Sequence, residues 1–226
     1  MRAAARALAL AAAVAVCGCA YFNGMYYANH YTRLAESAER AGRTGDARDR
    51  WQQAEIHADS LIAHHPRSHW VTEAQLVRGR ALVHLEAYAD AAVALQLALR
   101  GTVSASQHME ALGLIGHAYL MLGLLDSAAE MLDTAVDARA SEVRDEALLD
   151  RGRLFMTRRQ PDSARVDLAR SRDPHAPFDL AHVELVLGDT AAAGALYDSL
   201  AGLKAFPEGA WHDGLDSQDA SLKPGG

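Results

Sequence analysis

Small and apolar residues between Ala74 and Val136 follow one pattern that occurs twice. Each position of the first copy lies 37 residues before its counterpart in the second. The matching positions are Gly79, Leu82, Glu86, Tyr88, Ala91, Leu95 and Ala98, then Gly116, Tyr119, Gly123, Leu125, Ala128, Leu132 and Ala135. A fixed period of this length indicates a solenoid, because one unit is too small to bury its own apolar face and stacks on its neighbours.

The spacing inside each copy predicts two antiparallel helices joined by a short turn. Gly79 and Gly116 stand where the two helices of a pair must approach closely, and a turn follows seven residues later, at Glu86 or Gly123. A second small residue comes five positions after the turn, and Leu and Ala then recur at helical spacing. The repeating unit is therefore a pair of helices closed by contacts between small residues.

Three less regular copies accompany these two. Their marker residues are Ala47, Trp51 and Ala54 in the first unit, Gly152, Phe155, Ala164 and Leu168 in the fourth, and Ala181, Gly188, Ala193 and Tyr197 in the fifth. The pattern resembles the tetratricopeptide repeat. The resemblance implies an all-α, tetratricopeptide-like solenoid of about five antiparallel helix pairs in a right-handed superhelix. The fifth unit is shorter than the others, which suits the terminal cap of a solenoid.

Glycine and proline predict where several helices begin and end. The first helix is expected over about residues 25–41, and Gly45–Asp46 offers a turn and an N-cap for the second. Pro66 ends that second helix, and Ser68 can cap the third. Pro161 opens a helix at a position where its missing N–H does no harm.

The N-terminal segment has the pattern of a secretory signal. Arg2 and Arg6 precede an apolar run of ten residues, Ala7–Val16, which is too short for a hydrocarbon core that needs roughly 20 residues. Gly18 and Cys19 follow and resemble a bacterial lipobox, in which a small residue precedes the cysteine that becomes the lipidated N-terminus of the mature protein. An ordinary cleaved signal with an incidental cysteine is the alternative.

Lipidation at Cys19 would anchor the protein stably, since stable anchoring takes more than one acyl chain. In Gram-negative lipoproteins a residue other than Asp after this cysteine resembles the outer-membrane sorting signal, and here that residue is Ala20. The expected location is the cell outer membrane, lipid-anchored, on the periplasmic side. The aromatic residues that follow either lie at the membrane interface or pack the first helix against the next. They are Tyr21, Phe22, Tyr26, Tyr27 and Tyr31.

Charge and residue usage argue against several classes of function. The chain has a formal charge of −7, and loss of the signal leaves 20 basic against 29 acidic side chains, a charge of −9, which is the wrong sign for binding nucleic acid. No phosphate-binding loop or nucleophile elbow occurs, so no catalytic residue, enzymatic activity or cofactor is expected. Four histidines, His57, His64, His65 and His69, gather near one helix end. No metal site is expected there, because a metal normally needs three or four convergent ligands with acidic or thiolate help.

Two rows of charged residues recur with the repeats. The residue after each small anchor is Arg80, His117, Arg153 or His182, and the residue six before it is Glu73, Glu110 or Glu146. In the tetratricopeptide arrangement these positions line the concave groove, with Val83, Leu120, Met121 and Met156 along the same wall. The rows either pair with each other between neighbouring repeats, or hold a segment of a partner protein, with Arg80 and Arg153 binding its carboxylates or carbonyls.

These expectations divide the chain into four parts. They are a lipoprotein signal peptide (1–18), a lipidated N-terminus and linker (19–25), a tetratricopeptide-like repeat domain (26–203) and a flexible C-terminal tail (204–226). Within the tail, Phe206, Trp211 and Leu215 either fold back on the last helix pair or form a recognition segment for a partner.

The lipobox, the aromatic start, the repeats and the segment Pro66–Trp70 together resemble the outer-membrane assembly lipoproteins typified by BamD, over roughly residues 19–140. This resemblance implies a non-enzymatic, protein-binding scaffold in the cell envelope, with a β-barrel assembly complex as partner. The alternatives are a scaffold or pilot lipoprotein of another envelope complex, such as a secretin or a polysaccharide-export complex, and a helical-repeat envelope enzyme or metal-binding protein.

Overall fold

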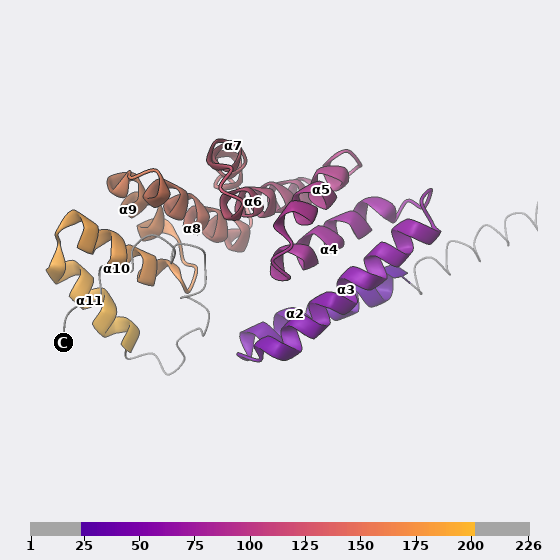
Figure 1. Cartoon of the computed structure of the whole chain (residues 1–226), viewed down its shortest axis with the longest axis horizontal. Helices are drawn as coiled ribbons and strands as arrows, with labels where there is room; N and C mark the ends of the chain where they lie inside the picture. Colours follow the sequence, from indigo (N-terminus) through magenta and orange to yellow (C-terminus); the bar gives the residue numbers. More distant parts are fainter. Residues whose placement is uncertain (1–23, 202–226) are drawn as a thin grey trace, which may run out of the picture. The chain divides into compact units, whose positions relative to one another are not determined.

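The computed structural model describes residues 24–201, and every regular element within them is a helix (Figure 1). In chain order the helices are α2 (Tyr26–Arg40), α3 (Thr44–His64), α4 (Val71–His84), α5 (Tyr88–Leu99), α6 (Ala105–Met121), α7 (Leu125–Ala135), α8 (Ser141–Thr157), α9 (Pro161–Arg170), α10 (Ala176–Leu187) and α11 (Thr190–Ala201). The chain forms two compact units, which divide within α6 between Leu114 and Ile115. The expected signal peptide, the lipidation site and the C-terminal tail from residue 204 lie outside the described residues.

Consecutive helices form the pairs that the repeat pattern predicts. In the first unit α2 packs on α3 and α4 on α5, and in the second α8 packs on α9 and α10 on α11. In the remaining pair, Gly116 of α6 lies against Leu132 of α7. The predicted all-α, tetratricopeptide-like fold of five helix pairs is confirmed for the described residues. None of their helices is both long enough and apolar enough to cross a membrane.

Glycine permits the closest approach of the two helices in the three central pairs. A Cβ atom placed on Gly79 would lie 2.4 Å from Cγ of Leu95, and one placed on Gly152 would lie 2.6 Å from Cγ of Leu168. Both leucines are at most 2% exposed. The small residues read from the sequence are therefore the contact points of each pair, and the leucine sixteen positions later fills the space beside them.

Each pair turns through one residue in the left-handed backbone region. These residues are Gly42, Glu86, Gly123, Arg159 and Gly188, with φ between 58° and 85°. The N–H of the next residue donates to the carbonyl five positions earlier, at 2.8–2.9 Å, which is the Schellman arrangement. Each lies seven positions after the small residue of its first helix and five before a buried alanine of its second. The turns predicted at Glu86 and Gly123 are confirmed.

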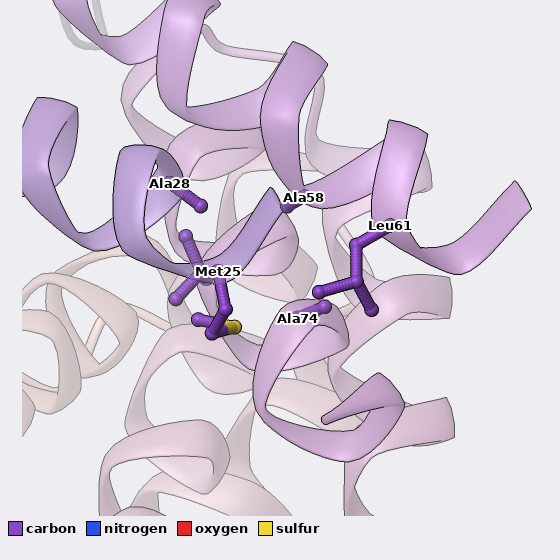
Figure 2. Close-up of a cluster of buried hydrophobic side chains, with 6 residues drawn as sticks. Met25, Ala28, Ala58, Leu61 and Ala74 are labelled. Carbon is purple, nitrogen blue, oxygen red and sulfur yellow. The ribbon is translucent and has the colours of Figure 1, made fainter. Parts of the chain in front are cut away.

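The core of the first unit begins before α2. Met25 is fully buried and packs with Ala28 of α2, Ala58 and Leu61 of α3, and Ala74 of α4 (Figure 2). These side chains come from three successive helices, so the N-terminal end of α2 is held by the core of its unit.

Two predicted helix boundaries differ from the structure. Gly45–Asp46 does not cap α3, because the helix already begins at Thr44, directly after the turn at Gly42. The hydroxyl of Ser68 accepts the N–H of Trp70 at 3.2 Å, and α4 begins one residue later, at Val71. Pro161 is the first residue of α9, as predicted.

Candidate partner-binding surface

In the first unit, Arg80 of α4 links the first helices of neighbouring pairs. Its guanidinium donates to the carboxylate of Glu110 in α6 and lies 3.6 Å from Oε1 of Glu36 in α2. The three side chains are partly exposed, with values of 26% for Arg80, 22% for Glu110 and 36% for Glu36. One cation therefore joins two carboxylates, and this part of the surface keeps a surplus negative charge.

Two other predicted groove residues of this unit have contacts of their own. Oε1 of Glu73 accepts a hydrogen bond from Nδ2 of Asn29 at 3.1 Å, which ties α4 to α2. Val83 is half-buried and packs against the cluster formed by Leu82, Ala91 and Ala94. Val83 thus contributes to the core between α4 and α5 as well as to the surface.

In the second unit, Asp150 and Asp179 pair with two of the predicted basic residues, His117 and Arg153. Nδ1 of His117 lies 3.0 and 3.1 Å from the two carboxylate oxygens of Asp150 in α8. Nε of Arg153 donates to Oδ2 of Asp179 in α10 at 2.7 Å, and its NH1 lies 3.9 Å from Asp150. The charged side chains of α6, α8 and α10 therefore form one connected series within this unit.

The remaining predicted residues of the second unit are spread over the same three helices. Leu120, Met121 and Met156 are half-buried, and Met156 packs on the core cluster that contains Leu149 and Leu168. His182 is exposed on α10. Glu146 lines a surface cavity of about 250 Å³, whose other lining residues are Glu142, Asp145, Arg172, Asp173 and Pro174.

Sequence reasoning missed three acids that contact the basic row: Glu36, Asp150 and Asp179. In the first helix pair, Glu36 occupies the position that Arg80 occupies in the second pair. It lies 44 residues before Arg80, the same offset that relates Ala47 to Ala91. Asp150 and Asp179 each lie three residues before a basic member of the row, Arg153 and His182. One helical turn separates such positions, so a search for acids at this spacing would have found both.

Three of the four clustered histidines contact different partners, and the fourth, His65, is half-buried. The ring of His57 stacks between Tyr27 and Tyr31, with centroids 5.2 and 5.5 Å away. Nδ1 of His64 lies 2.8 Å from the carbonyl of Ser60, and His69 lies against Trp70. Within residues 24–201, no three His, Cys, Asp or Glu side chains are grouped so that they could hold a metal ion.

A titrating pair lies in the link before α10. Oδ1 of Asp173 accepts the backbone N–H of His175 at 2.8 Å and lies 2.9 Å from its Nδ1. The side-chain hydrogen bond to Asp173 raises the pKa of His175. Burial by itself would raise the pKa of Asp173, but the hydrogen bonds from His175 outweigh it, so this pKa is lowered.

This pair predicts a pH-dependent stability of the second unit. The raised pKa of His175 gives stability that is complete below the unfolded value of about 6.5 and is lost as pH rises through the folded pKa. The lowered pKa of Asp173 gives stability present above about 3.9 and lost as pH falls through the folded pKa. His175→Gln should therefore destabilise the unit most between these limits, by less than about 1 kcal/mol because solvent screens the pair.

Hydrogen exchange of the α10 amides at about pH 5.5 and about pH 8.5 measures this difference, with exchange rates corrected for pH. His182→Gln removes an exposed histidine of α10 and serves as the control. An equal effect of His175→Gln at both pH values would show that the pair does not titrate between them.

A scan against family models and a search of curated proteins gave no match. Several solved structures are similar in fold, including the following three. MamA is 16% identical with a TM-score of 0.53, covering 70% of this chain and 90% of its own. BtubC from P. vanneervenii is 15% identical with a TM-score of 0.55, covering 81% and 94%. A Podosopora anserina protein described as a kinesin light chain with nearly identical TPR-like repeats is 18% identical with a TM-score of 0.52, covering 76% and 92%. At these identities the likeness establishes the fold, which is all-α and tetratricopeptide-like.

Proposed function

We propose that this chain is a non-enzymatic scaffold that binds proteins, anchored by lipid at Cys19 to the periplasmic face of the outer membrane. Its proposed duty is that of an accessory in outer-membrane protein assembly, as in the BamD-like lipoproteins. The observation that carries the scaffold function is the series of charged side chains on the first helices of tetratricopeptide-like pairs. The proposed lipid anchor is supported by the signal-like start and by Gly18 before Cys19. The proposed outer-membrane location is supported by Ala20 after this cysteine.

The pairing of the arginines favours a particular kind of partner. Arg80 already binds Glu110 and lies beside Glu36, and Arg153 already donates to Asp179. A partner carboxylate would have to displace one of these acids, whereas the acids keep free lone pairs for further donors. A segment that presents Lys, Arg or backbone N–H groups therefore suits the surface better than an acidic one.

The experiment is a pull-down of the mature, lipidated protein from its own envelope in mild detergent, with mass spectrometry of the bound proteins. We expect a β-barrel assembly protein to be recovered. Glu110→Gln combined with Asp179→Asn should weaken its capture by about tenfold or more, because each change removes an acceptor from the charged surface of its own unit. Arg80 and Arg153 keep Glu36 and Asp150 in this variant.

The matched control removes two negative charges elsewhere. Asp49→Asn in α3 and Asp137→Asn after α7 change exposed residues, one in each unit. Equal capture by the two double variants would exclude this surface as the binding site. Recovery of a secretin or an export component would support the scaffold function but contradict the proposed role in outer-membrane protein assembly.

A further inference from the structure

An exposed group of aromatic rings covers the N-terminal end of α2. This α2 aromatic patch consists of Tyr26, Tyr27, His30 and Tyr31 of α2 and His57 of α3. Tyr26 stacks on His30 at 6.1 Å between centroids, and both Tyr27 and Tyr31 stack on His57. Tyr26 and Tyr27 remain 41% and 43% exposed. Packing within the unit therefore uses only part of each ring, and the rest of the two tyrosines faces solvent.

The charge pattern sets this end of the protein apart from the rest. All 29 acidic residues of the chain lie from Glu36 onward, so no acidic side chain precedes the third turn of α2. The exposed side chains that follow directly after the tyrosines on α2 are Arg33 and Leu34, and the exposed Ser37, Glu39 and Arg40 come only at the far end of the helix. The start of α2 itself carries tyrosine, leucine and arginine and no acid, although Glu73 of α4 accepts a hydrogen bond from its Asn29. This composition is favoured where a helix meets lipid headgroups, because rings and apolar stems enter the interface while hydroxyl and guanidinium groups stay hydrated.

We infer that the α2 aromatic patch contacts the surface of a lipid bilayer. The inference rests on the proposed function for its anchor. Cys19 lies seven residues before Tyr26, so even a fully extended chain keeps the patch within about 25 Å of the acylated residue. A tether of this length makes the local lipid concentration high, and a contact that would hold the free protein only at millimolar lipid then suffices. The acyl chains supply attachment, and the patch supplies the orientation of the first helix pair.

The first experiment removes the acyl chains. The mature chain from residue 19, with Cys19→Ser, is mixed with vesicles of phosphatidylethanolamine and phosphatidylglycerol at millimolar lipid, and the bound fraction is measured by sedimentation. We expect measurable binding, which falls by about tenfold when Tyr26→Gln and Tyr27→Gln remove the two exposed rings. Circular dichroism confirms that both proteins keep their helices.

A matched variant controls for loss of apolar surface. Val93→Gln and Leu97→Gln change two side chains of α5 in the same unit, which are 55% and 40% exposed. This variant should bind vesicles as the parent chain does. Absence of binding by the parent chain, or the same binding by both double variants, overturns the inference.

A separate experiment decides the anchor. Flotation of the lipidated protein with liposomes at micromolar lipid, which is too dilute for the patch alone, should be lost in Cys19→Ser and kept in Cys17→Ser. Loss in the Cys17 variant, or flotation of both variants, contradicts lipidation at Cys19 and leaves the vesicle result to stand by itself. If flotation is lost only in Cys19→Ser while the two double variants bind vesicles equally, the contact of the patch with the bilayer is refuted and lipidation at Cys19 is supported.

Discussion

Replacing Arg151 with Met is expected to lower the free energy of unfolding of the second unit by about 3–5 kcal/mol. Nε and NH2 of Arg151 donate to the two carboxylate oxygens of Asp167 at 2.6 and 2.9 Å. Asp167 is only 2% exposed, and its hydrogen bond raises the pKa of Arg151. Without the guanidinium, a buried carboxylate loses its main partner and has little access to water.

Two further variants make this prediction specific. Arg170→Met removes a 59% exposed guanidinium that lies 3.8 Å from the same carboxylate, and should cost less than about 1 kcal/mol. Arg151→Met combined with Asp167→Leu should recover most of the loss, because no buried charge remains. Hydrogen exchange of the α8 and α9 amides measures the stability of all three variants. A double variant as unstable as Arg151→Met would mean that lost packing, not the unpaired charge, causes the effect.

Replacing Gly152 with Ala is expected to destabilise the second unit by about 1–2 kcal/mol, although Ala is the better helix former. The new Cβ would lie 2.6 Å from Cγ and 2.8 Å from Cδ2 of Leu168, which is itself buried. Overpacking of this kind costs about 1–3 kcal/mol, and the gain in helix propensity of up to about 1 kcal/mol offsets only part of it.

Gly194→Ala, a change in the same unit, is expected to have the opposite effect on stability. Gly194 lies inside α11, and a Cβ placed on it has no atom within 4 Å. This change should stabilise the unit by about 0.5–1 kcal/mol, since only the propensity term remains. Urea unfolding of the two variants compares their signs. Stabilisation by both would show that α8 and α9 can separate at little cost, contrary to the contact described.

The helix pairs could be predicted from the sequence because their determinants are local. The small residue, the turn and the buried alanine recur at fixed distances, and helical geometry converts these distances into positions on one face. The start of α3 could not be predicted from cap residues, because the left-handed Gly42 places Thr44 in the helix directly. The start of α3 is thus set by the backbone conformation of the turn and not by capping from the side chain of Asp46.

The charged surface was predicted less completely than the fold. The positions of Arg80 and Arg153 followed from the repeat, but their partners depend on which helices become neighbours and on the side chains that these helices present. Arg80 reaches Glu110, a predicted residue, whereas Arg153 reaches Asp179, which lies outside the predicted row. A recurring position therefore identifies a charged residue without identifying its counter-ion.

The constant spacing within pairs has a consequence for how this protein changes over evolution. From turn to turn the intervals are 44, 37, 36 and 29 residues, while the spacing from the small residue through the turn to the buried alanine stays the same. All of the variation thus falls outside the stretch from the small residue to the buried alanine. The links themselves are five or six residues long throughout, so the variation lies in the lengths of the helices that flank them. Insertions and deletions should be tolerated toward these helix ends and purged from the turns. In homologous genes, length differences are expected in the helix ends on either side of residues 65–70, 100–104, 136–140 and 171–175.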